Sequence, residues 1–214
     1  MLVRKWGCSV GGDSYEGKKD EDGARTLGLE EACVEEARVS FATSKWAIAS
    51  GVGCVYFFSF LSAYHQNCAL VGERGLSPGA VRVERLRPGS GYEDWRRFVA
   101  QPSVWYFTPF TDESLQRVCV AGLALSAFAA LGGHFAPVFA ALWLLHFSLV
   151  LAGEGSSFYS YGWESQLLEA GFLTVFLCGV CDCAHRPTLP VLYLFRWLCF
   201  RVSVGAGLRG APAL

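Results

Sequence analysis

The sequence predicts an all-α fold, a polytopic transmembrane helix bundle with about five spans. Of the 214 residues, 52% are hydrophobic and 17% are charged, whereas a soluble domain usually has about 25% charged residues. The charge is also uneven, since much of it lies before Lys45 and between Glu73 and Arg117. The rest of the chain is apolar over lengths that match a bilayer, which is typical of membrane-spanning helices.

Residues 1–45 are polar and mixed in charge, and we expect a cytosolic N-terminal tail here. Leu27 to Phe41 has some helical character within that tail. About the first 30 residues contain no apolar stretch typical of a secretory signal. The first apolar helix is therefore expected to act as an uncleaved signal anchor, and to open a transmembrane bundle over residues 46–208.

The first span is expected over residues 46–70, which contain no Asp, Glu, Lys or Arg. This exceeds the roughly 20 apolar residues that a helix needs to cross a bilayer. Residues 71–117 then read as a polar luminal loop, because glycines and prolines interrupt it repeatedly. Within the loop, the aromatic segment 104–110 contains Pro109 and fits a position at the membrane interface better than a crossing.

An apolar stretch follows over residues 118–152, which is too long for a single crossing at about 1.5 Å rise per residue. The sequence GGHFAP divides it into two short spans, 118–131 and 138–152. We expect a helical hairpin with Gly132 and Gly133 at the turn. Because each half is short, local thinning of the bilayer, a tilted pair or a partly re-entrant hairpin are alternatives.

Two further spans are expected over residues 164–180 and 189–208, followed by a short tail at 209–214. Five crossings place the two ends of the chain on opposite sides of the membrane. His185 and Arg186 favour the cytosol for the connection between the last two spans. On that basis the N-terminus is cytosolic, and the long loop and the C-terminus are luminal.

Ionisable residues occur inside these last two apolar segments: Glu164 and Glu169 in one, Arg196 and Arg201 in the next. A charge at bilayer depth costs several kcal/mol, on the order of 3 or more, unless it is paired or hydrated. We expect Glu164 at the headgroup level near the start of its helix, and Glu169 paired with Arg196 or Arg201. The two glutamates are about 140° apart around a helix, which argues against a paired-carboxylate catalytic site.

Other polar groups have two interpretations each. His65, Gln66 and Asn67 are either a helix end that emerges into water or partners in hydrogen bonds to the segment around Trp163 and Glu164. Cys178, Cys181, Cys183 and His185 form one cluster, which fits buried or acylated thiols better than the two separated ligand pairs of a zinc site. His134 and His146 are isolated, and we expect them to pack or to form hydrogen bonds.

No phosphate-binding, dinucleotide-binding or hydrolase motif is present, so we expect no cofactor and no catalytic residue. The net charge of −1 makes nucleic acid an improbable partner.

Three segments carry a resemblance to a known family. They are YHQNCALVGERGLSP (residues 64–78), FYSYGWESQLLEAGFL (residues 158–173) and RWLCFRVSVGAGL (residues 196–208). In their order and spacing they resemble the lipase maturation factor family, and the His-Gln-Asn stretch is nearer to the first of its two vertebrate branches.

The resemblance implies a multi-pass membrane protein of the endoplasmic reticulum that assists the folding, assembly and maturation of secreted dimeric lipases of the lipoprotein lipase and hepatic lipase group, and not an enzyme. Family members continue into a long luminal region after the third segment, whereas only RGAPAL follows Leu208 here. We therefore expect a fragment or truncated form, in which the region that would engage a lipase is largely missing.

Two alternatives stay open at this stage. Polar residues that converge from several helices, such as His65, Glu164, Glu169 and Arg196, could line the site of an integral-membrane enzyme that acts on a lipid or acyl substrate. A transporter-like bundle is the other alternative, although no inverted repeat is evident.

Overall fold

The computed structural model describes residues 19–86, 96, 98–154, 156, 159, 162–180 and 189–210. The chain divides into two compact units, Met1–Ser40 and Phe41–Leu214. The described part of the first unit is helical. The second unit contains all the contacts between helices that are considered below.

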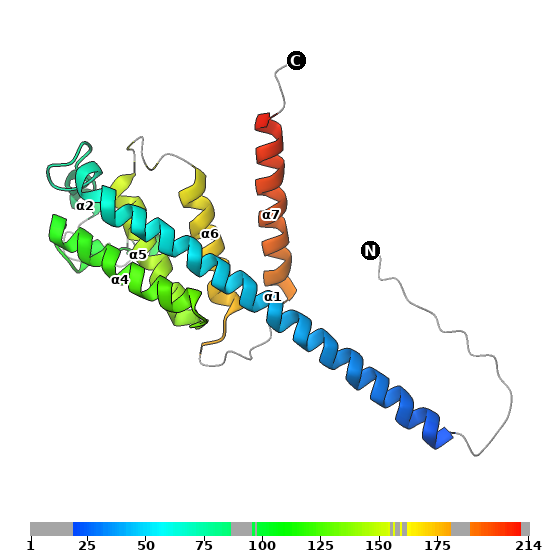
Figure 1. Ribbon diagram of the computed structural model, residues 1–214. Helices are drawn as coiled ribbons and strands as arrows, with labels where there is room; N and C mark the ends of the chain where they lie inside the picture. The colour runs from blue at the N-terminus through cyan, green and yellow to red at the C-terminus, as the bar shows by residue number, and fades with distance from the viewer. Residues whose placement is uncertain are drawn as a thin grey trace. The chain divides into compact units, whose positions relative to one another are not determined.

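The described residues contain helices and no strand, which confirms the all-α prediction (Figure 1). The elements in chain order are α1 (Lys19–Leu70), α2 (Ala80–Leu86), the 3-10 helix η1 (Val104–Tyr106), α4 (Asp112–Ala130), α5 (Ala136–Gly153), α6 (Gly162–Leu177) and α7 (Leu189–Gly210). Each predicted span has a helix, but α1 begins at Lys19, well before the expected position 46. Helical structure therefore replaces much of the expected tail.

Among the described helices, three are long and apolar enough to cross a membrane: Ala42–Leu70, Ala136–Gly153 and Leu189–Gly207. The helix α6 has only 16 residues. The helix α4 has 19 residues, but its first turns carry Asp112, Glu113 and Arg117. These two helices correspond to the expected second and fourth spans, and length and composition alone do not qualify them as crossings.

The helices α4 and α5 form the predicted hairpin. Gly132 has a φ of 120°, a backbone conformation that residues with a Cβ rarely adopt. The hydroxyl of Thr111 accepts a hydrogen bond from the amide of Ser114 and caps the start of α4. Pro137 stands in the first turn of α5, where its missing amide hydrogen leaves no bond unmade.

Hydrogen bonds between segments far apart in sequence define two ends of the bundle. At one end, the amide of Glu73 donates to Asp112 Oδ1 at 2.8 Å, and Arg82 donates to the carbonyl of Ala152 at 3.1 Å. At the other end, the amide of Ala136 donates to the carbonyl of Gly179 at 3.1 Å. Successive helices therefore run in alternating directions, as crossings of a membrane require.

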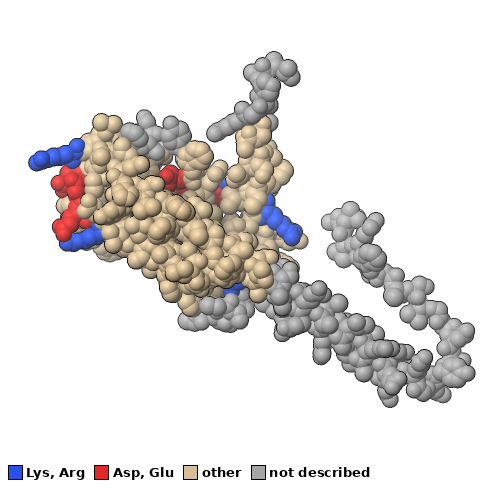
Figure 2. All heavy atoms as spheres, viewed as in Figure 1, with Lys and Arg blue, Asp and Glu red and all other residues tan. Residues whose placement is uncertain are grey.

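Charged side chains are also unevenly distributed over the bundle. On the face in Figure 2, many charged side chains gather at the end of the bundle where α2 and the start of α4 lie, and a few others lie around α6 and α7. An apolar body with a charged end fits a helix bundle surrounded by lipid.

His134 lies in the turn between α4 and α5, where its Nε2 is 2.9 Å from Ser50 Oγ of α1. Burial, and secondly the nearby charge of Lys45, hold the pKa of His134 below its ordinary value of 6.5. Above pH 6.5 the imidazole is neutral in both the folded and the unfolded chain. Below it, the unfolded chain takes up a proton first, so the free energy of unfolding falls.

We therefore expect the free energy of unfolding of His134→Gln to fall less than that of the unmodified chain when the pH is lowered from 6.5. Unfolding of the detergent-purified protein, followed over a series of pH values, measures this effect. The exposed His65→Gln variant is the control and should keep the slope of the unmodified chain. Equal slopes for all three proteins would contradict the assignment.

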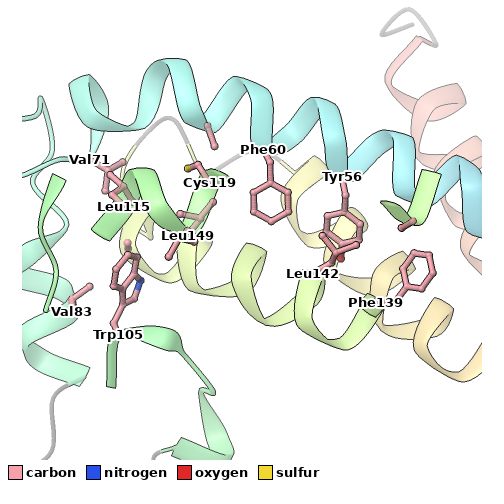
Figure 3. Close-up of a cluster of buried hydrophobic side chains, with 14 of the residues drawn as sticks. Tyr56, Phe60, Val71, Val83, Trp105, Leu115, Cys119, Phe139, Leu142 and Leu149 are labelled. Atoms are coloured by element: carbon pink, nitrogen blue, oxygen red, sulfur yellow. The ribbon is translucent and has the colours of Figure 1, made fainter. Parts of the chain in front are cut away.

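The core joins α1, α4 and α5 (Figure 3). Tyr56 and Phe60 of α1 are fully buried and point at Leu142 and Leu149 of α5. Glycines allow the close approach of the helices: a Cβ at Gly122 of α4 would meet the Phe60 ring at 2.4 Å. Small residues at such contacts are typical of helix pairs in membranes, where no hydrophobic effect draws helices together.

The region expected to be a polar loop is instead partly folded onto α5. Trp105 of η1 is 1% exposed, a burial that was not predicted from the sequence. Its Nε1 donates to the carbonyl of Ser148 at 2.7 Å, and the amide of Val104 donates to Ser148 Oγ at 2.9 Å. A buried indole needs a partner for its N–H group, and Ser148 provides a carbonyl for the ring and a hydroxyl for the adjoining backbone.

Candidate functional site

A groove between α1, α5 and α6 is lined by both apolar and polar side chains. Its volume is about 390 Å³. Four of the sequence-predicted residues from the end of α1 and the start of α6 line it: Gln66, Asn67, Trp163 and Glu164. The other polar residues in the lining are Ser59, Ser62, His146 and Tyr159.

His146 lies deep in this groove, against Glu164 of α6. The His146 Nε2 atom is 2.8 Å from Glu164 Oε2, and the His146 side chain is 3% exposed. The rings of Tyr56 and Phe60 stand edge-on to the imidazole, with centroids at 5.6 and 5.8 Å. Glu164 is in the first turn of α6, where the helix dipole favours a carboxylate.

The contact between His146 and Glu164 is close in distance but poorly aligned. Within the described part of the chain, neither ring nitrogen of His146 makes a hydrogen bond with acceptable angles, and neither does Glu164 Oε2. The two side chains therefore approach closely without full hydrogen bonding. Sequence reasoning missed this pairing, because His146 stands alone in an apolar helix.

Asn67 is buried at the end of α1 and accepts a hydrogen bond at 2.7 Å from the hydroxyl of Tyr159. Burial raises the pKa of Tyr159 above its ordinary value, and the nearby Glu164 adds to the effect. The phenol therefore stays protonated and keeps donating. Of the predicted polar cluster, His65 and Gln66 are exposed, as a helix end in water would be. Asn67 instead fits the second interpretation, in which it forms a hydrogen bond to another segment of the chain.

Removing the Tyr159 hydroxyl is expected to destabilise the bundle by about 1–3 kcal/mol, since it leaves the Asn67 side chain buried without its donor. A double-mutant cycle of Tyr159→Phe and Asn67→Leu, followed by unfolding in detergent, isolates the pairwise coupling. We expect a coupling of about 1 kcal/mol. Tyr64→Phe, at a partly exposed tyrosine of α1, is the matched control and should change little.

Glu169 lies outside the groove and forms an ion pair with Arg201 of α7. Arg196 is directed elsewhere, with its guanidinium carbon 5.7 Å from the centre of the Tyr193 ring. The predicted pairing between Glu169 and an arginine of the next helix is thus found, with Arg201 as the partner. Glu164 and Glu169 have different partners, so these two carboxylates do not form a joint catalytic centre.

Reversing the charge of one member of this pair is expected to lower the amount of folded protein in the membrane. Glu169→Arg combined with Arg201→Glu should restore it, because the attraction returns with exchanged partners. Protease resistance of the membrane-inserted chain measures the outcome. Glu169→Arg with Arg196→Glu is the matched control and should not restore folding. Equal rescue by both combinations would contradict the assignment to Arg201.

The predicted cysteine cluster is only partly visible. Cys178 is buried, whereas Cys181, Cys183 and His185 lie outside the described residues. Among the residues that the structure describes, no group of three or more His, Cys, Asp or Glu side chains could hold a metal ion.

Comparisons with known proteins place this bundle in a family. Residues 43–210 match the model of the lipase maturation factor transmembrane domain. Lipase maturation factor 1 of Homo sapiens is 38% identical over 180 residues, and that of Bos taurus is 36% identical over 178 residues. Each alignment covers 79% of this chain and 31% of the relative.

Lipase maturation factor 2 of Xenopus tropicalis is more distant, at 29% identity over 185 residues. The chain therefore spans less than a third of the length of these relatives. No solved structure matches it.

Proposed function

The chain belongs to the lipase maturation factor family, and from this premise we propose that it acts in the endoplasmic reticulum membrane to assist the folding, assembly and maturation of secreted lipases. The dimeric lipases of the lipoprotein lipase and hepatic lipase group are the proposed partners. The family match over residues 43–210 carries the proposal, because it includes every helix from the apolar part of α1 to α7.

In this proposal the bundle is an anchored scaffold. The apolar helices hold it in the bilayer, and the folded segment from α2 to η1 gives one end a fixed surface of protein outside the lipid. We place that end in the lumen, where a secreted lipase folds, and residues 1–45 in the cytosol. The bonds from Arg82 to Ala152 and from Trp105 to Ser148 would keep this surface rigid.

The enzyme alternative gains no support. The relatives are named as maturation factors, and Glu164 and Glu169 contact His146 and Arg201 separately. We therefore propose a scaffold that acts through contacts, without turnover of a substrate.

A chimera tests the proposal. Residues 43–210 replace the matched segment of human lipase maturation factor 1, and the chimera is expressed in lipase-producing cells that lack their own maturation factors. We expect secreted lipase activity to rise while lipase synthesis stays constant. The proposal would be overturned by a chimera that reaches the membrane of the endoplasmic reticulum and folds, but leaves secreted lipase activity no higher than in cells without the chimera.

A further inference from the structure

The groove between α1, α5 and α6 combines an apolar rim with a polar interior. Val55 and Phe58 of α1 are 54% and 65% exposed and form part of the rim. Asn67, His146 and Glu164 reach the interior from three different elements. A ligand that fits this surface must itself be amphipathic, with a polar head group beside the glutamate and an apolar chain along α1.

Unmade hydrogen bonds in the interior point to a ligand. Both ring nitrogens of His146 and Oε2 of Glu164 are buried without a well-aligned partner among the described residues, although Nε2 and Oε2 face each other at 2.8 Å. Buried polar groups in proteins are almost always hydrogen-bonded, because the groups lose their water on burial. His146 and Glu164 line the groove, so a molecule seated there could supply bonds to them.

The lining also restricts the charge of the head group. It contains the carboxylate of Glu164 and no lysine or arginine. A phosphate would meet a negative charge with no cation to balance it. Hydroxyl groups can donate to the carboxylate, and they can accept from or donate to Ser62, Gln66 and His146. The volume of about 390 Å³ lies within the range of about 300–1,000 Å³ that is usual for small-molecule sites.

We propose that this groove binds a lipid with an uncharged, hydroxyl-bearing head group, which lies beside Glu164 and His146 while its acyl chain follows Val55 and Phe58. This is a binding site and involves no chemical step. It does not depend on the proposed role in lipase maturation, since occupancy can be measured on the chain alone.

A photo-crosslinking experiment tests the site. The full chain is reconstituted in phosphatidylcholine nanodiscs with a photoactivatable diacylglycerol at low mole fraction. We expect crosslinks to map to peptides that contain Phe58 or Glu164. Unlabelled diacylglycerol should lower the crosslink yield at least fivefold, and the same amount of phosphatidic acid should not. Equal competition by the two lipids would overturn the proposal.

Matched variants make the assignment specific to the groove. Ser62→Leu fills it at an exposed position of α1, and Glu164→Gln removes the carboxylate. Each is expected to lower the yield at least fivefold. Cys54→Leu, at an exposed position of α1 outside the lining, is the control and should keep the yield. If Glu164→Gln fails to fold, Ser62→Leu decides, and an unchanged yield in that variant would overturn the proposal.

Discussion

Replacing Gly53 by alanine is expected to destabilise the bundle by about 1–3 kcal/mol, the usual cost of overpacking a tight contact. A Cβ at this position would lie 2.8 Å from the amide nitrogen of Ala130 and 3.1 Å from the carbonyl carbon of Ala129. Both atoms belong to the backbone of α4, so no side-chain rotation can relieve the clash. The helices α1 and α4 would have to separate.

Gly51 provides the matched control, because it lies two residues away in the same helix and a Cβ there meets nothing within 4 Å. Alanine favours a helix over glycine by about 1 kcal/mol, so Gly51→Ala should leave stability unchanged or raise it. Thermal unfolding of both variants in one detergent measures the difference. Equal midpoints for the two variants would show that α1 and α4 do not approach as described.

Replacing Trp105 by alanine is expected to cost about 3–5 kcal/mol, as truncation of a buried aromatic side chain usually does. The variant loses the hydrogen bond to the carbonyl of Ser148 and the edge-on contact with Phe110, whose ring centroid is 4.9 Å away. The segment around η1 should then leave α5, and protease sites in residues 98–111 should become accessible.

Phe107 is the control for this experiment. It stands two residues further along the same segment and is 79% exposed. Phe107→Ala removes a ring of similar size without opening a cavity, so it should alter unfolding by less than about 0.5 kcal/mol. Limited proteolysis combined with unfolding in detergent distinguishes the two variants. Rapid cleavage of both, or of neither, would mean that Trp105 does not hold the segment.

The sequence was sufficient for the features that depend on local chemistry. Apolar runs of membrane length predicted the positions of the helices, and the pair Gly132 and Gly133 predicted the turn of the α4–α5 hairpin. The need to neutralise Glu169 predicted an arginine partner. Arg196 and Arg201 are five residues apart, about 140° around a helix, so only one of them could face α6. The choice between them depends on the rotation of α7, which the sequence does not specify.

The contacts of the groove depend on rotation in the same way. The helix α5 is apolar on all sides, so no polar face marks which side is buried. The approach of His146 to Glu164 follows from how α5 and α6 turn toward each other. The burial of Trp105 was missed because an aromatic, proline-containing segment fits a membrane interface equally well. Its burial depends on Ser148, which lies 43 residues downstream.

The bonds that close one end of the bundle also set an order of assembly during synthesis. The partner of Trp105 lies 43 residues downstream and that of Arg82 lies 70 residues downstream. At about 5–20 residues per second, a ribosome needs on the order of seconds to make that stretch. Throughout that delay the indole N–H lacks its acceptor on Ser148, so the nascent polypeptide passes through a stage in which this segment is not yet attached to α5.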